Sequence, residues 1–358
     1  MQLSNKLQDI ISNIKIYSSS FSISHDSINY INNSIEIVKE IQKMPPEIQF
    51  QYLNTQLSEL LYRKYFDGSN HIEKKPEIKT NTQLLKEIAS CEIDWEFYEQ
   101  LELNNQGRGF FHPSFHMMKQ ELDGSVAAYF DQFILHVQPE IHLPVAQKYA
   151  TVNDRITPKL PSSFINEENY RANGDYLGNL SSESSEKDAV FVYFNFTSEI
   201  AVNAMKLITQ KLNENQIPFF FEVLHNPLNY GRYKSGFLNF CSYHYEEFIL
   251  PLLKIIYTEN KSQFQAQIPL FTKEIAPGIG LAEHPIPELG GRFGKNRCQI
   301  LANALLEAHK NGEESQQSRI KYIIQHFESV GIDFERPYLN PNNEDIYTPL
   351  ELFSSVKY

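Results

Sequence analysis

Three cationic side chains in the second half of the chain could bind or transform an anion. Lys273 follows Phe271-Thr272 and precedes a Pro-Gly turn at Pro277-Gly278. A lysine acts as a general base only if burial or neighbouring cations lower its pKa, and otherwise it stays a cation that binds anions. Arg232 follows a flexible Tyr-Gly pair, and Arg297 lies near the expected start of a helix. A guanidinium group grips two oxygens of a phosphate or carboxylate, and the N–H groups of a helix start add to this.

Each of these residues also has a simpler interpretation. Lys273 could be a surface lysine in a salt bridge, and from the residues alone this is the commoner case. Arg297 could pair with an acid such as Glu283 and tie its helix to the fold. His136 lies within a predicted strand, six residues before His142, but Pro139 argues against one continuous strand through both. Histidines in strands more often have a structural role.

The motifs of metal and cofactor sites are missing from the sequence. Cys91, Cys241 and Cys298 are scattered, so they predict neither a zinc site nor a disulfide framework. His112 and His116 have helical spacing, but Pro113 lies between them. Gly278-Ile279-Gly280 lacks the third glycine and the following helix of a dinucleotide loop. We therefore expect no metal and no cofactor.

Composition narrows the class of partner. The 358 residues carry a net charge of −12, which argues against a nucleic-acid or anionic-membrane surface and favours a basic peptide. Hydrophobic residues make up 41% of the chain, enough for a sizeable core. The first residues lack the pattern of a secretion signal, and no apolar run approaches the ~18 residues that span a bilayer. We expect a soluble cytoplasmic protein.

The pattern of apolar residues changes near Gln106 and predicts an α+β fold. We expect a helical N-terminal region over residues 1–104, with helices over 35–41, 52–61 and 82–88. A domain with a mixed or antiparallel sheet and packed helices is expected over residues 105–358. Its strands are predicted at 115–122, 126–137, 189–196, 219–224 and 236–240. Its helices are predicted at 198–212, 296–310 and 315–330, with a further helix that ends at Tyr257.

Three stretches taken together resemble the HopA-type type III effector family. They run from Pro218 to Pro227 and on to Tyr233, from Pro269 to Glu283, and from Phe293 to Cys298. The resemblance covers about residues 105–349. The family also includes the lyases of class V lanthipeptide biosynthesis, which eliminate phosphate from phosphoserine or phosphothreonine in a precursor peptide.

The resemblance implies a lyase that needs no metal or cofactor and a partner kinase that phosphorylates the same peptide. It makes His136 and His142 candidate acids and Lys273 a candidate base or anion ligand. Tyr170 lies in a segment similar to the family's short Tyr/Gly motif, so it could donate to an enolate or phosphate oxygen, or else be core. We expect Lys273, Arg232 and Arg297 to converge on one cleft, and reversing either arginine's charge to leave stability nearly unchanged.

At three positions the chain departs from the family pattern. Phe130, Ile141 and Glu222 stand where cations are expected. Each cation beside a phosphate dianion contributes on the order of 1–3 kcal/mol, so losing three would slow elimination greatly. The alternative function is therefore a non-catalytic peptide-binding or effector-like interaction protein of the same fold.

Overall fold

A seven-stranded antiparallel sheet forms the centre of the protein, with strand order β10-β11-β13-β14-β12-β16-β15. The computed structural model describes residues 2–25, 28–31, 33–69, 92–131, 133–166, 168–180 and 188–351. The strands of this sheet are β10 (Ser163–Ile165), β11 (Asn169–Asn173), β12 (Ala189–Phe194), β13 (Phe220–Leu224), β14 (Gly236–Cys241), β15 (Lys273–Ala276) and β16 (Ile279–Glu283). The α+β prediction is confirmed.

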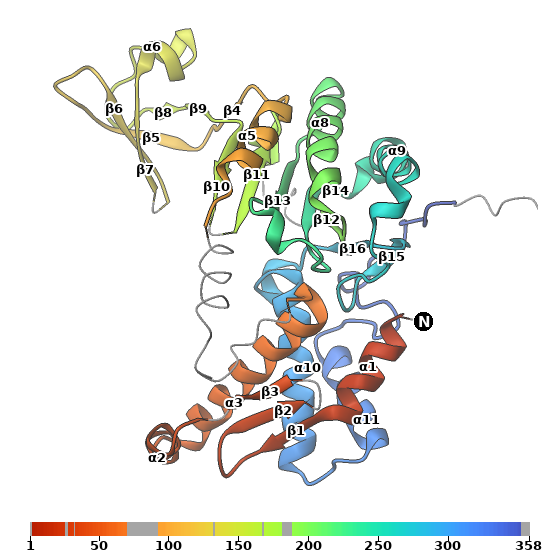
Figure 1. Cartoon of the computed structure of the whole chain (residues 1–358). Helices are drawn as coiled ribbons and strands as arrows, with labels where there is room; N and C mark the ends of the chain where they lie inside the picture. Colours follow the sequence, from red (N-terminus) through yellow and green to blue (C-terminus); the bar gives the residue numbers. More distant parts are fainter. Residues whose placement is uncertain are drawn as a thin grey trace, which may run out of the picture.

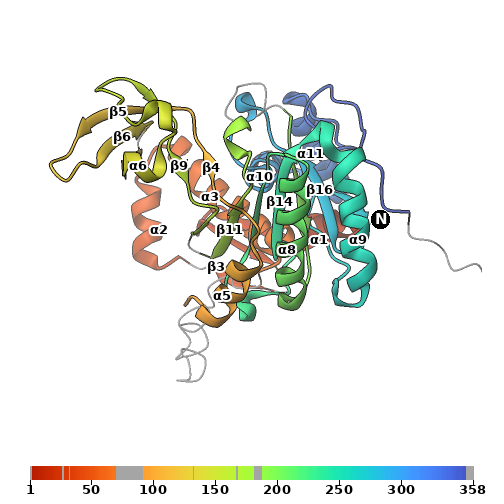
Figure 2. The ribbon, with the colours of Figure 1, turned by 90° about the horizontal axis from the view of Figure 1, so that it is seen from above.

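One face of the sheet is fully covered by three helices, which Figures 1 and 2 show along one side of the strands. They are α5 (Trp95–Asn104), α8 (Ser198–Glu214) and α9 (Leu250–Asn260). Alternate strand residues such as Val190, Val192 and Phe221 join these helices in one buried apolar cluster. This face carries the larger part of the sheet's core.

The opposite face is covered only in part. Helix α10 (Phe293–Lys310) packs there together with α1 (Gln2–Asn13), α3 (Pro46–Leu61) and α11 (Gln316–Ser329) in a second apolar cluster. From the central sheet, Tyr193, Phe237 and Ala282 belong to this cluster, and Phe191 and Phe220 pack against it. The remaining N-terminal elements are β1 (Ile14–Tyr17), β2 (Ser22–His25), β3 (Ile28–Ile31), α2 (Ile35–Gln42) and the π-helical turn η1 (Tyr62–Asp67).

A small four-stranded sheet projects from the body as an arm, at the upper left of Figure 1. Its elements are β5 (Phe115–Gln120), β6 (Val126–Phe130), β7 (Phe133–Val137), α6 (Pro139–His142) and β8 (Arg155–Ile156). Strands β4 (Phe110–Phe111) and β9 (Lys159–Leu160) pair where the arm joins the body. Short helical turns complete the chain: η2 (Val145–Gln147), η3 (Leu177–Leu180), η4 (Pro227–Asn229), η5 (Ser242–His244), η6 (Tyr245–Ile249), η7 (Lys261–Gln263) and η8 (Pro287–Leu289).

The structure corrects three details of the predicted elements. The first part of the chain is not wholly helical, because β1 to β3 form a sheet whose short strands the helical spacing around them obscures. The predicted strand 126–137 is two strands, because Asp131 takes the left-handed conformation (φ 52°) and reverses the chain. Helix α10 begins at Phe293, three residues before its predicted start. The predicted helix 82–88 and Cys91 lie outside the described residues, and the division after residue 104 stays a prediction.

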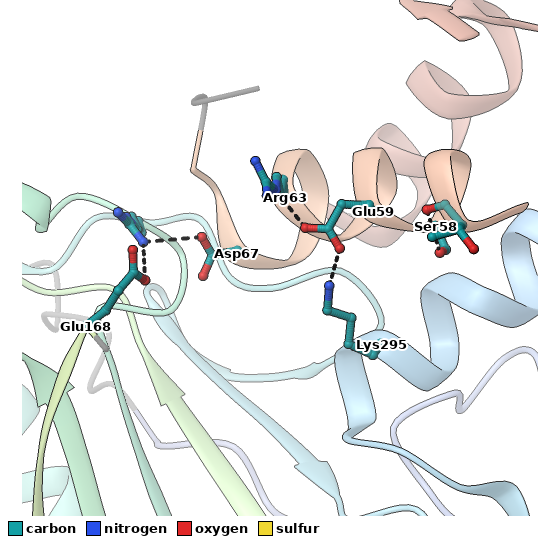
Figure 3. Close-up of polar contacts among 8 residues, drawn as sticks. Ser58, Glu59, Arg63, Asp67, Glu168 and Lys295 are labelled. Atoms are coloured by element: carbon teal, nitrogen blue, oxygen red, sulfur yellow. Dashed lines mark hydrogen bonds and ion pairs between the residues drawn. The ribbon is translucent and has the colours of Figure 1, made fainter. Parts of the chain in front are cut away.

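Ion pairs and one close contact fasten the N-terminal elements to the rest. The Glu59 carboxylate in α3 accepts from Arg63 at 2.6 Å and from Lys295 in α10, as the dashed lines of Figure 3 show. Nearby, Asp67 and Glu168 both face Arg232, at 3.7 and 3.0 Å. A Cβ on Gly294 would lie 2.5 Å from the Phe66 ring, so the glycine lets that ring pack on the start of α10.

Replacing Gly294 by alanine should lower the free energy of unfolding by about 1 kcal/mol. Overpacking against Phe66 costs about 1–3 kcal/mol, which exceeds the gain of up to about 1 kcal/mol in helix propensity. Urea denaturation measures the change. Gln325→Ala, on the exposed side of α11, is the control and should stay within about 0.5 kcal/mol of the wild type. A Gly294→Ala variant as stable as the wild type would contradict this packing argument.

Candidate functional site

The partly covered face of the sheet brings one arginine, one glutamate and several aromatic side chains together. Because strand residues alternate between faces, Arg171, Glu222, Phe237 and Tyr193 point away from α8. The register places them side by side across four strands, with Arg171 opposite Glu222, Glu222 opposite Phe237, and Phe237 opposite Tyr193. Phe220, Asn239 and Phe191 form a second such row. These two rows are the floor of a cavity.

The cavity has a volume of about 630 Å³, within the range of small-molecule and peptide side-chain sites. Its walls come from segments far apart in the sequence. Tyr62 and Phe66 end the α3 region, His112 lies where the arm joins the body, and His284 follows β16. The start of α10 closes the ring with Arg292, Phe293 and Gly294.

Arg171 is held firmly on the floor. Its Nε donates to Asn173 Oδ1 at 3.0 Å, and its guanidinium stacks on the Phe220 ring at 3.7 Å from the ring centroid. One terminal nitrogen lies 3.6 Å from a Glu222 oxygen. Burial lowers the pKa of Arg171 to about 10, against the opposing effect of Glu222, so the group is charged at neutral pH. The other terminal nitrogen has no protein partner among the described residues, so a ligand could bind it.

Two more cations line the cavity without a carboxylate partner among the described residues. Lys234 Nζ lies 3.5 Å from the Tyr62 hydroxyl and 5.1 Å from the centroid of the Phe237 ring. Arg292 is exposed at the N-cap of α10, and its charge helps to lower the pKa of Arg171. No side chain caps this helix start, so its first N–H groups add a partial positive charge at the cavity wall.

Glu222 is the one carboxylate that lines the cavity in the described part of the chain. With Arg171, Lys234 and Arg292 it leaves a formal charge of +2, in a chain whose net charge is −12. Glu222 is buried, and apart from Arg171 it accepts a long hydrogen bond of 3.4 Å from Asn166 Nδ2. A local positive site inside an acidic protein is an arrangement suited to an anion.

Two histidines line the cavity, and the Nδ1 of one of them, His112, accepts from the Ser114 N–H at 3.4 Å. Burial lowers the pKa of its imidazole, so the neutral form predominates at pH 7. Its ring lies 4.9 Å from the Phe130 ring and 5.2 Å from the Phe115 ring, centroid to centroid. His284 also lines the cavity, with its ring 5.4 Å from that of Phe191.

Comparison with known proteins identifies the family. The model of the HopA1 effector protein family matches residues 161–339, half of the chain and inside the 105–349 stretch of the predicted resemblance. The chain belongs to the HopA1 effector protein family. The match contains the cavity floor and the start of α10.

Two solved structures that are similar to this chain are effector proteins of Pseudomonas syringae. The structure from pathovar syringae strain 61 has 11% sequence identity to this chain and a TM-score of 0.42. The match covers 80% of this chain and 98% of that protein. The structure from pathovar tomato strain DC3000 has 13% sequence identity and a TM-score of 0.40. The match covers 80% of this chain and 97% of that protein. No curated protein matches the chain.

The three cations predicted from the HopA1-like motifs do not meet at this cavity. Lys273 Nζ donates to Asp345 Oδ2 at 2.6 Å. Arg232 lies between Asp67 and Glu168. Arg297 is fully buried and donates to the carbonyl oxygens of Pro337 and Leu339, at 2.8 and 3.0 Å. Each charge is already satisfied by protein acceptors, so the expected common anion cleft of Lys273, Arg232 and Arg297 was wrong.

The other predicted site residues also lie outside the cavity lining. Tyr170 is buried on the α8 face, and its hydroxyl donates to Glu102 at 2.7 Å. His136 is exposed on β7, with its Nδ1 3.8 Å from Glu121. His142 ends the short helix α6 and accepts from the Gln138 N–H at 3.0 Å. Their proposed catalytic roles stay predictions without support from these positions.

Of the three departures from the family pattern, Glu222 forms part of the cavity floor and Phe130 packs on His112. Ile141 is 66% exposed on the arm.

Sequence reasoning missed Arg171, Lys234 and Arg292, although each is close to a residue that it named. Arg171 follows Tyr170, and strand alternation puts one in the cavity and the other in the core. The apolar residue Ala172 lies on the same face of the strand as Tyr170. This pattern could have assigned Tyr170 to the core and Arg171 to the opposite face. Arg292 precedes the true helix start, five residues before Arg297.

In the part of the chain that the structure describes, no group of three His, Cys, Asp or Glu side chains is arranged to hold a metal ion. A search of the same residues finds no helix that combines the length and the apolar character needed to cross a membrane.

Two arginines at the start of α10 should respond differently to replacement by methionine. Arg297→Met leaves two buried carbonyl groups without donors, at about 1–3 kcal/mol each, so the free energy of unfolding should fall by about 2–5 kcal/mol. Arg292→Met changes an exposed side chain and should stay within about 0.5 kcal/mol of the wild type. Urea denaturation of both variants compares them. Equal stability of the two variants would contradict the structural role of Arg297. It would instead favour the expectation from the sequence that this arginine contributes little to stability.

Proposed function

We propose that the cavity binds a phosphorylated serine or threonine of a peptide and eliminates its phosphate to leave a dehydroamino acid. The observation that supports this is the formal charge of +2 in the cavity, supplied by cations that the protein leaves without enough acceptors. A phosphate dianion is the ligand of matching charge. The volume of about 630 Å³ leaves room for the backbone and a neighbouring side chain of the peptide.

The phosphate would be held by Arg171 from the floor and by Arg292 with the N–H groups at the start of α10 from the wall. Arg171 is oriented before the ligand arrives, because Asn173 and the Phe220 ring fix its guanidinium. Such preorganised donors stabilise charge without reorganising during the reaction. Lys234, beside Tyr62, would stabilise the peptide carbonyl as it gains enolate charge.

His112 is the base of the proposed step. Its neutral imidazole takes the Cα proton, and the electron pair of the Cα–H bond forms the Cα–Cβ double bond. The Cβ–O bond breaks, and its electron pair leaves with the phosphate, whose charge the cations balance. The proposal assigns no step to a metal or cofactor. A kinase must phosphorylate the peptide beforehand, because the step consumes the phosphate ester.

A second candidate, a phosphopeptide-binding protein without catalysis, is favoured by one observation. Glu222 lies 3.6 Å from Arg171 and weakens the positive field at the point where the leaving phosphate gains charge. In that case the same residues bind the phosphorylated peptide, but no elimination follows.

Arg171→Met should weaken phosphopeptide binding about ten- to hundredfold, the factor that corresponds to a charged hydrogen bond. The probe is a library of synthetic phosphothreonine peptides with randomised flanking residues. Binding is read by fluorescence anisotropy and elimination by mass spectrometry, as a loss equal to phosphoric acid. Arg336→Met, which removes an exposed arginine outside the cavity, is the matched control and should leave both readings unchanged. Binding without loss of phosphate would select the second candidate; equal binding by both variants would exclude the phosphate site.

The elimination rate should depend on pH through His112. Burial lowers the pKa of this histidine, so its basic form persists to lower pH than that of an ordinary histidine. The rate should therefore rise with pH below neutrality, with its midpoint below 6.5, and level off by pH 7. His112→Gln should lower the rate about 10²–10⁴-fold and remove this dependence, while peptide affinity is retained. An unchanged profile in the variant would assign the base to another group.

A further inference from the structure

The arm carries an unusual concentration of exposed apolar side chains. Tyr149, Val145, Phe133 and Ile134 are 89%, 78%, 66% and 57% exposed. Its own core is small and is formed by residues such as Phe115, Val126 and Ile156. Exposed apolar side chains gathered on one small part of a protein are typical of an interaction site.

The outer edge of this sheet is strand β7. In the strand order β7-β6-β5-β8, β7 pairs with β6 alone among the described residues. Every second residue of an antiparallel edge strand directs its N–H and C=O groups outward, where another strand could bind them. Natural edge strands are usually protected by lysine, proline or a bulge, but Phe133-Ile134-Leu135-His136-Val137 has none of these.

The β7 edge begins next to the cavity. Phe130, which pairs with Phe133 across the β6–β7 turn, packs on His112, and His112 lines the cavity. From this turn β7 runs for five residues, so it offers about 17 Å of strand edge. A peptide with one residue in the cavity could therefore continue along the edge without a long detour.

We propose that β7 binds an extended, apolar and basic segment of the same peptide, which pairs with this edge as an added strand. Backbone hydrogen bonds would give affinity, and alternate apolar side chains of the peptide would contact Ile134 on one face of the sheet. The net charge of −12 favours basic residues at the remaining positions. The inference rests on the proposed function for the phosphorylated residue that occupies the cavity.

The test uses the full chain and labelled synthetic peptides with one phosphothreonine in a Gly-Ser background. One pair carries Val-Lys-Val-Lys-Val either before or after the phosphothreonine, and a matched pair carries Gly-Lys-Gly-Lys-Gly. Wild-type protein should bind one of the valine peptides at least about tenfold more tightly than its glycine match, the factor expected from burying one aliphatic side chain. Ile134→Lys should abolish this preference. Leu122→Lys, at the fully exposed β5–β6 turn, is the matched control and should retain it.

Equal affinity for valine and glycine peptides in the wild-type protein would overturn the inference. The inference would also fail if light scattering showed that the wild-type protein is a dimer and that Ile134→Lys is a monomer. A second copy of the chain would then cover the β7 edge. Peptides with threonine in place of phosphothreonine separate the two proposals. If the valine preference persists while phosphorylation changes nothing, the docking edge stands and the phosphate site fails.

Discussion

The unequal covering of the two faces of the seven-stranded sheet decides where a ligand can bind. Strand alternation sends Tyr170 and Val192 to the face that α5, α8 and α9 cover completely, and this face becomes apolar core. The same alternation sends Arg171 and Glu222 to the face that α10 covers only near Tyr193. Polar groups on the first face would be buried without water, which is costly. The cavity and its charges therefore form on the second face.

The supply of acceptors separates the cations that the fold already pairs from those that are candidates for binding a ligand. Arg297 is surrounded by the carbonyl oxygens of the 337–339 segment, and Arg232 has two carboxylates. Adding an anion to either would require breaking these contacts. Arg171 has one carboxylate at 3.6 Å, and Lys234 has only a long contact with a hydroxyl group. An anionic ligand can supply the acceptors that Arg171 and Lys234 lack, so these two residues are the better candidates for an anion site.

The sequence predicted the elements well and the site poorly, for one physical reason. Long periodic segments such as α8 and α11 follow from local spacing. The family resemblance depended on local motifs and was confirmed. Whether a cation lines a cavity depends on acceptors distant in sequence. Nothing near Lys273 reveals its partner Asp345, which lies 72 positions further along the chain.

Glu222 is the residue through which the charge of the cavity is set. It offsets the cost of burying the Arg171 guanidinium, and it would compete with the proposed phosphate ligand for that group. The Glu222 carboxylate repels a dianion more strongly than a monoanion, but the formal charge of +2 that remains in the cavity also attracts the dianion more strongly. The charge reversal at this position is therefore compatible with selective phosphate binding.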